Sequence, residues 1–326
     1  MKTERFYENQ INQAAKLIQE GETVAFPTDT VYGLGADARN EAAVQKIFAA
    51  KGRPAGRALT ILLAEKETMT EYAKEIPAEA ALLVDHFWPG PLTIVLEAKG
   101  NLAPAVTAGL KTIGMRMPAD PIALKFIQAA GMPLATPSAN RTGRPSPTTA
   151  EHVLTDLDGR IAAVIDGGET DSGIESTVLD LSNPEKPVIL RPGAITKGQI
   201  EKLIGRKVTK IEEKAVDKKQ EKHYQPGIPI YLVKSNWTEA FEQMKEEQVA
   251  LLASEEIVET YGEEALESYS LGKRKSIKEA QKSFFKAIRS LEKTEATVIL
   301  AELYPENEAS EAYLNRLEKA ATGKII

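Results

Sequence analysis

At 326 residues, the chain is longer than a single ordinary hydrophobic core supports, so two domains are expected. Its 42% hydrophobic and 27% charged residues are typical of a soluble globular protein, and a formal net charge of −6 argues against the broad basic surface of a dedicated nucleic-acid binder. The absence of cysteine excludes disulfides and thiolate metal sites, and without a membrane-length apolar run or a secretory signal the chain is expected in the cytoplasm, with no membrane partner.

The first two hundred residues alternate short apolar runs with segments whose apolar residues recur at helical spacing. Helices are predicted at residues 11–18, 41–50, 78–87, 121–130 and 196–204. Strands are predicted at residues 23–27, 59–63, 92–96, 112–117, 161–165, 176–181 and 188–191. The last three strands follow one another closely, which suggests an antiparallel portion. A mixed, twisted α/β sheet with helices is therefore expected over residues 1–205.

The composition changes after residue 205. Seven lysines or arginines lie among few apolar residues between Gly205 and Lys222, so residues 206–226 are predicted to be a linker, one that could close over an active site. Beyond it, predicted strands and amphipathic helices alternate, at residues 230–233, 237–245, 249–253, 278–291, 297–301 and 308–320. That order predicts a smaller parallel, Rossmann-like α/β domain over residues 227–326.

The most distinctive stretch is the polar loop, residues 137–148. It places hydroxyls, an amide, two arginines and three prolines directly after an apolar run. Because proline fixes φ and removes a backbone donor, the loop is predicted to be stiff and to leave a strand end. Its side chains at Ser138, Asn140, Arg144 and Ser146 suit an anionic ligand with donors and acceptors around it, such as a nucleotide.

Cations recur near other predicted strand ends. Lys51 could simply complement the negative end of a helix, but Arg53 and Arg57 lie beyond that helix in a Gly/Pro loop, where arginine suits phosphates or carboxylates. Arg116 interrupts an apolar strand. Either it is buried and needs an anionic partner, or it lies on an edge strand and faces water.

Two further polar groups have both a structural and a functional interpretation. Residues 28–35 could contact a ligand or form a hairpin turn with a Thr/Asp cap, and Ser176 and Arg191 could be a capping hydroxyl and a surface charge. Their recurrence in successive elements favours one shared cleft. Because no phosphate-loop, G-x-G-x-x-G or H-E-x-x-H signature is present, the cations indicate chemistry driven by positioning and charge stabilisation.

Five motifs, in order along the chain, resemble those of the YrdC-like family. They are Thr28–Leu34, Lys51-x-Arg53-Pro54, Trp88–Thr93, Gly114-x-Arg116-x-Pro118 and Pro137–Asn140. The match covers about residues 10–204, and the C-terminal part is similar to that of the longer, two-domain threonylcarbamoyl-AMP synthases. One departure concerns the linker motif of those enzymes, of which only His223-Tyr224-x-Pro226 is present.

The resemblance implies a nucleotidyltransferase that makes threonylcarbamoyl-AMP and pyrophosphate from L-threonine, bicarbonate and ATP. The product would serve tRNA modification by downstream transferase proteins, and contact with tRNA itself is left open. Magnesium is implied with ATP, although no dedicated ligand set is visible. An RNA-binding module that uses the same cleft without turnover is the alternative. A hydrogenase-maturation carbamoyltransferase is disfavoured, because those proteins carry cysteine-rich zinc segments.

The resemblance also assigns residues to roles. L-threonine is expected to be bound by Thr30, Arg116, Thr136 and Ser176. ATP is expected to be bound by Arg53, Arg57, Thr112, Ser138, Ser146, Arg191 and Tyr224. The catalytic residues, near the reacting phosphate and carbamate, are expected to be Lys51, Arg53 and Asn140.

Overall fold

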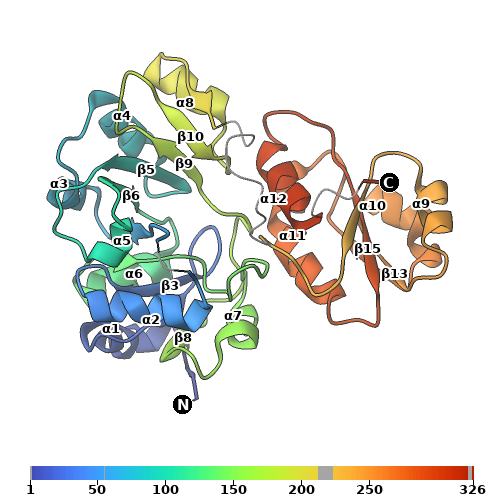
Figure 1. Cartoon of the computed structure of the whole chain (residues 1–326), viewed down its shortest axis with the longest axis horizontal. Helices are drawn as coiled ribbons and strands as arrows, with labels where there is room; N and C mark the ends of the chain where they lie inside the picture. Colours follow the sequence, from blue (N-terminus) through green and yellow to red (C-terminus); the bar gives the residue numbers. More distant parts are fainter. Residues whose placement is uncertain (1, 55, 212–222, 322–324) are drawn as a thin grey trace. The chain divides into compact units, whose positions relative to one another are not determined.

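The computed structural model describes residues 2–54, 56–211, 223–321 and 325–326, and the chain divides into two compact units (Figure 1). Most residues up to 211 form the first unit, and most from 223 onward form the second. Two short segments from earlier in the chain, Gly143–Ser146 and Ser172–Ile174, belong to the second unit. None of the described helices is both long and apolar enough to cross a membrane.

A mixed sheet of eleven strands runs through the first unit in the order β1-β8-β2-β3-β7-β4-β6-β5-β9-β10-β11. Its strands are β1 (Glu4–Phe6), β2 (Val24–Phe26), β3 (Gly33–Asp37), β4 (Thr60–Leu62), β5 (Leu92–Glu97), β6 (Thr112–Arg116), β7 (Leu134–Ala135), β8 (Ala163–Ile165), β9 (Thr177–Asp180), β10 (Val188–Arg191) and β11 (Thr209–Lys210). The order is far from the chain order, so neighbouring strands bring together side chains that are distant in sequence.

The helices of the first unit are α1 (Ile11–Gln19), α2 (Glu41–Lys51), α3 (Met69–Tyr72), α4 (Ala78–Phe87), α5 (Pro104–Thr107), α6 (Pro121–Ala130), α7 (Ala150–Leu157) and α8 (Lys197–Ile204), with 3-10 turns at Glu8–Gln10 and Lys66–Thr68. Local sequence fixes their ends. The Asn40 side chain accepts a hydrogen bond from Ala43 N at 3.2 Å and so caps the start of α2, and Gly52 ends α2 with a left-handed φ of 58°.

Alternating strand residues divide the core between the two faces of the sheet. On one face, α1 and α6 bury Ile18 and Phe126 against strand residues such as Phe26, whose ring centroid lies 5.0 Å from that of Phe126. On the other face, α2, α4 and α7 pack against residues such as Ala25 and Ile61. Helices therefore cover both faces, and polar loops are left at the strand ends.

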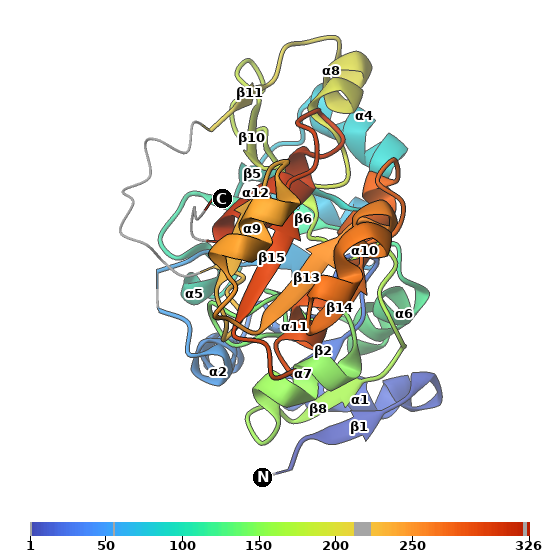
Figure 2. The same cartoon turned by 90° about the vertical axis from the view of Figure 1, so that its right-hand side faces the viewer.

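The second unit is a four-stranded parallel sheet in the order β12-β15-β13-β14. Figure 2 shows β15, β13 and β14 of this sheet side by side. Its strands are β12 (Ile230–Val233), β13 (Val249–Ala253), β14 (Glu267–Ser270) and β15 (Val298–Glu302). Its helices are α9 (Trp237–Gln243), α10 (Glu255–Tyr261), α11 (Ile277–Leu291) and α12 (Glu311–Ala321), with a 3-10 turn at Gly262–Glu264. Helices α9 and α10 pack on one face through Trp237 and Tyr261.

The predicted fold class, a mixed sheet with helices followed by a smaller parallel α/β domain, is confirmed. Several local predictions were incomplete or wrong. Strand β3 was interpreted as part of a turn. Of the three closely spaced strands expected to form an antiparallel portion, β9 and β10 do pair antiparallel, whereas β8 pairs in parallel with β1 and β2. Strands β1, β11 and β14 and helices α3, α5, α7 and α10 were not predicted. Strand β14, for example, is a half-exposed edge strand without an apolar run.

The predicted linker, residues 206–226, includes β11, which pairs in parallel with β10. Residues 212–222 of this linker lie outside the described residues. Residues 223–226 belong to the second unit.

Gly33 begins β3 at a point where the chain passes very close to β7. A Cβ atom at Gly33 would overlap the methyl group of Thr136, and the ring of Phe26 lies near the same point. Strand β3 pairs with β2 on one side and β7 on the other, so its backbone cannot move away easily. Glycine is therefore required here by close approach and not by an unusual φ.

We expect Gly33→Ala to lower the free energy of unfolding of the first unit by about 1–3 kcal/mol, because the added methyl group overpacks the contact. The chain has two tryptophans, so in a Trp237→Phe background the fluorescence of Trp88 reports urea unfolding of the first unit. Adding Thr136→Ser removes the clashing methyl group and should restore most of the loss. A double variant as unstable as Gly33→Ala would contradict the steric explanation.

Candidate active site

The polar loop is fixed at its base by the turn that joins β2 to β3. Leu34 N donates to Pro137 O and Tyr32 N donates to Pro147 O, both at 2.8 Å. Ala139 N donates back to Tyr32 O at 2.8 Å. Two of the predicted clusters, residues 28–35 and the polar loop, are therefore adjacent, as a shared cleft requires.

Lys51 is the cation at the centre of this arrangement. It is the last residue of α2 and is only 3% exposed. Its Nζ donates to Ser138 O and to Asn140 O, each at 2.5 Å, while its own carbonyl accepts from Thr142 N at 2.9 Å. Lys51 thus binds the backbone of the polar loop on both sides of Ala139.

Burial, and to a smaller extent the charge of Arg53, lowers the pKa of Lys51 to about 7, whereas Asp156 acts in the opposite direction. A neutral amine still has two N–H groups, enough for both carbonyls, and protonation adds a third for a ligand. Between pH 7 and the ordinary pKa of 10.5, Lys51 binds fewer protons in the folded chain than in the unfolded chain. The free energy of unfolding therefore increases as the pH rises through that range.

Arg53 lies just beyond α2. Its Nη2 donates to Ala58 O at 3.3 Å, and burial, followed by the charge of Arg57, lowers its pKa to about 10. The side chain is therefore still a cation at neutral pH. The two arginines repel each other, and an anion between them would relieve that repulsion.

Arg116, at the end of β6, is 5% exposed and is held on three sides. Its Nη1 donates to Thr30 Oγ1 at 2.9 Å and its Nε to Gly90 O at 3.0 Å, and its Nη2 forms an ion pair with Asp29. The Asp29 carboxylate also accepts from Ala119 N at 3.0 Å. Of the two interpretations of Arg116, the buried cation with an anionic partner is correct.

Ser176 forms a second buried polar group, and it is 3% exposed. Its hydroxyl lies 2.9 Å from Thr93 Oγ1 and accepts from Arg191 Nη2 at 3.1 Å, while Arg191 Nε donates to Ser176 O at 3.0 Å. The segment between Trp88 and Leu92 links this group to Arg116, because Gly90 O accepts from Arg116 and Pro91 O accepts from Thr177 N.

The other predicted site residues of the first unit make no described hydrogen bond to Arg116 or Ser176. Thr136 adjoins Gly33, and its Oγ1 donates to Leu134 O at 2.9 Å. Thr112 begins the strand that Arg116 ends, so the two predicted site residues lie at opposite ends of β6. The Asn140 side chain is buried, and its Nδ2 donates to Arg141 O at 2.9 Å.

Ser146 and Tyr224, both expected at ATP, lie in the second unit. Ser146 is 1% exposed. Tyr224 has a left-handed φ of 57°, and its ring centroid is 5.2 Å from that of Phe285.

Two residues absent from the predicted site now belong with it, Asp29 and Thr93. Asp29 pairs with Arg116, and Thr93 contacts Ser176. Their signals in the sequence were indirect: a buried arginine requires an anion, and a threonine follows the Trp-Pro-Gly-Pro motif.

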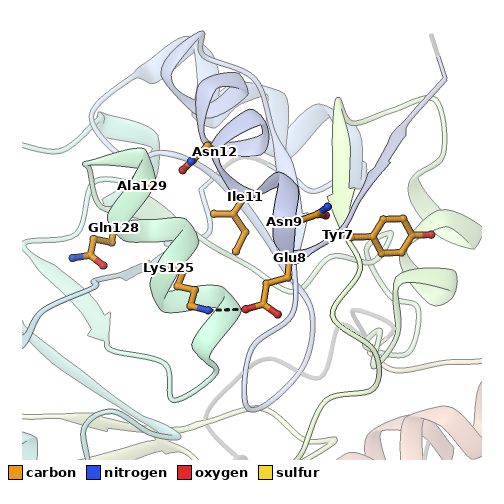
Figure 3. A pocket seen from close by; sticks show the side chains of 8 residues that line it. All are labelled: Tyr7, Glu8, Asn9, Ile11, Asn12, Lys125, Gln128 and Ala129. Carbon is orange, nitrogen blue, oxygen red and sulfur yellow. Dashed lines mark hydrogen bonds and ion pairs between the residues drawn. The ribbon is translucent and has the colours of Figure 1, made fainter.

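Among the described residues, no group of three histidine, aspartate or glutamate side chains is placed to hold a metal ion. A groove does occur between α1 and α6 (Figure 3), lined by Tyr7, Glu8, Asn9, Ile11, Asn12, Lys125, Gln128 and Ala129. A 2.6 Å ion pair between Lys125 and Glu8 crosses it. None of the predicted site residues lines this groove.

We expect Asp29→Ala to destabilise the first unit by about 3–5 kcal/mol, because it leaves the guanidinium of Arg116 buried without its anionic partner. The double variant Asp29→Ala/Arg116→Met removes both charges and should be more stable than Asp29→Ala alone. Urea unfolding followed by Trp88 fluorescence measures both. Additive losses in the double variant would contradict a buried pair.

Two family models match the chain. One, described as "Telomere recombination" and named for Sua5, YciO and YrdC, matches residues 16–193, and the other, described as "Threonylcarbamoyl-AMP synthase, C-terminal domain", matches residues 195–322. Together these two matches cover nearly all of the chain.

Full-length relatives and a solved structure agree with these matches. Threonylcarbamoyl-AMP synthase of Bacillus subtilis is 41% identical, with 100% of both chains covered, and that of Pyrococcus abyssi is 43% identical over 99% of this chain and 97% of the relative. A crystal structure of P. abyssi Sua5 complexed with L-threonine superposes with a TM-score of 0.91 at 41% identity, covering 100% of this chain and 99% of that one. The chain belongs to the two-domain threonylcarbamoyl-AMP synthase family.

Proposed function

We propose that this chain makes threonylcarbamoyl-AMP and pyrophosphate from L-threonine, bicarbonate and ATP. Its full-length similarity to threonylcarbamoyl-AMP synthases and to a structure complexed with L-threonine supports the reaction. The observation that carries the proposal is the pair of buried polar groups around Arg116 and Ser176, joined through Gly90 and Pro91 beside the polar loop.

L-threonine would lie against Thr30, Arg116, Thr136 and Ser176. Three of the five N–H groups of Arg116 are engaged by described residues, which leaves two for the substrate carboxylate. Asp29 and Gly90 hold the guanidinium in one orientation, so little side-chain entropy is lost when substrate binds.

ATP would lie against Arg53, Arg57 and Ser138. Thr112 and Arg191, which binds Ser176, are the further contacts predicted in this unit. Lys51 and Asn140 would lie near the reacting groups, where the protonated Lys51 amine offers its third N–H to a phosphate oxygen. Mg²⁺ would enter with the triphosphate and neutralise part of its charge.

The chemistry needs two anions to meet. The threonine amine and bicarbonate first give a carbamate and water. A carbamate oxygen then bonds to the α-phosphorus as the bond to the β-phosphate oxygen breaks, and pyrophosphate leaves with the electron pair. Fixed cations would lower this barrier by stabilising charge that develops in the transition state. Arg53 and Arg57 would act in this way, and so would Lys51 when its amine is protonated.

We place the reaction in the cytoplasm, where the product would be passed to tRNA threonylcarbamoyl transferase proteins. A direct contact with tRNA would be an additional property and is not needed for the reaction.

The test is threonine-dependent release of pyrophosphate in the presence of bicarbonate and ATP, with detection of the adenylate product. Arg53→Ala and Ser138→Ala should each abolish product while circular dichroism stays unchanged. The matched control Arg160→Ala changes an exposed arginine of the same unit and should retain wild-type activity. No turnover by the wild type, with RNA binding that weakens steeply as salt rises, would favour the RNA-binding alternative.

A further inference from the structure

One face of α11 gathers two segments from other parts of the chain within the second unit. Phe285, Arg289 and Glu292 follow one another at helical spacing of four and three residues, so they lie on the same side. Phe285 is within α11, Arg289 is in its last turn and Glu292 directly follows it. The segments they contact are Gly143–Ser146 and Tyr224–Gly227. Each segment carries one predicted ATP contact, Ser146 in the first and Tyr224 in the second.

Glu292 contacts both segments with one carboxylate. Arg144 binds it in bidentate fashion, with Nη2 donating to Oε2 at 2.7 Å and Nη1 donating to Oε1. Gly227 N donates to the same Oε1 at 2.5 Å. The side chain of Glu292 is 15% exposed and that of Arg144 30% exposed, so water screens this pair less than a surface pair.

Arg289 adds a second, buried contact. It is 2% exposed, and its Nη2 donates to Pro145 O at 2.5 Å. The two gathered segments also bond to each other, since Gln225 N donates to Gly143 O at 2.8 Å. The ring of Tyr224 packs against Phe285 on the same helix.

These contacts fix backbone that has no regular structure of its own. Neither Gly143–Ser146 nor Tyr224–Gly227 lies in a helix or strand, so their conformations depend on such side-chain contacts. Ordering them before the ligand arrives removes an entropy cost that ATP binding would otherwise bear.

We propose that Glu292 and Arg289 are positioning residues for ATP, which act by holding the segments of Ser146 and Tyr224 in their binding conformations. This inference rests on the proposed function. Neither residue needs to touch ATP, and neither is expected to affect the binding of L-threonine.

The decisive variant is Glu292→Gln, which keeps size but removes the charge. We expect the KM for ATP to rise about ten-fold, as loss of a charge-assisted hydrogen bond predicts, while the KM for L-threonine stays within about two-fold. Binding of a non-hydrolysable ATP analogue, measured by calorimetry without threonine, should weaken by the same factor. Glu295→Gln, an exposed glutamate three residues on, is the matched control and should behave as wild type.

A merely structural role would lower the thermal midpoint and kcat but leave both KM values unchanged, and that result would overturn the proposal. An equal rise in the two KM values would overturn it as well. Because the wild type is assayed in parallel, failure of the proposed reaction appears as no pyrophosphate release at all and is not confused with either result.

If Glu292→Gln does not fold, Arg144→Gln breaks the same pair from its more exposed side and takes its place. Where both variants fold, the double variant Arg144→Gln/Glu292→Gln should raise the KM for ATP no more than Glu292→Gln alone, because both changes remove one contact. If the rise in the KM for ATP in the double variant were instead the product of the rises in the two single variants, the two residues would act separately, which would contradict the assignment.

Discussion

The buried amine of Lys51 is the contact on which the arrangement of the first unit's polar residues depends. It ends α2, and its two hydrogen bonds fix the carbonyls of Ser138 and Asn140. The loop carrying them is bound in turn to the β2–β3 turn, which presents Thr30 to Arg116. An apolar residue of the same length would leave two carbonyls without donors, so the position requires a buried nitrogen even though burial disfavours its charge.

The second constraint is the Arg116–Asp29 pair. A buried ion pair contributes little net stability compared with apolar packing, but it permits few alternative arrangements. Here it orients a guanidinium that still has N–H groups to offer, next to a threonine hydroxyl. In the proposed reaction, this rigid cation would bind the amino-acid substrate, and Lys51, Arg53 and Arg57 would bind the phosphates.

Sequence patterns predicted features that depend on neighbouring residues and missed those that depend on distant ones. The cap at Asn40 and the buried face of α1 follow from local spacing, and both are present. The sequence indicates that a buried Arg116 needs an anionic partner, but it does not identify Asp29 as that partner, because Asp29 is 87 residues away. Gly33 and Gly35 suggested a turn, and only the side chains of Phe26 and Thr136 show why a strand needs glycine there. No local signal placed Ser146 in the same compact unit as α11 (Ile277–Leu291), since that depends on how a segment much later in the chain folds.

The most direct measurement is an NMR titration of the Lys51 side-chain amine, assigned by comparison with Lys51→Met. If the amine is buried between the two carbonyls, it should titrate with a midpoint of about 7, and the amide of Thr142, which donates to Lys51 O, should shift with the same midpoint. A midpoint near the ordinary value of 10.5 would mean that the amine is exposed to water and does not hold the polar loop.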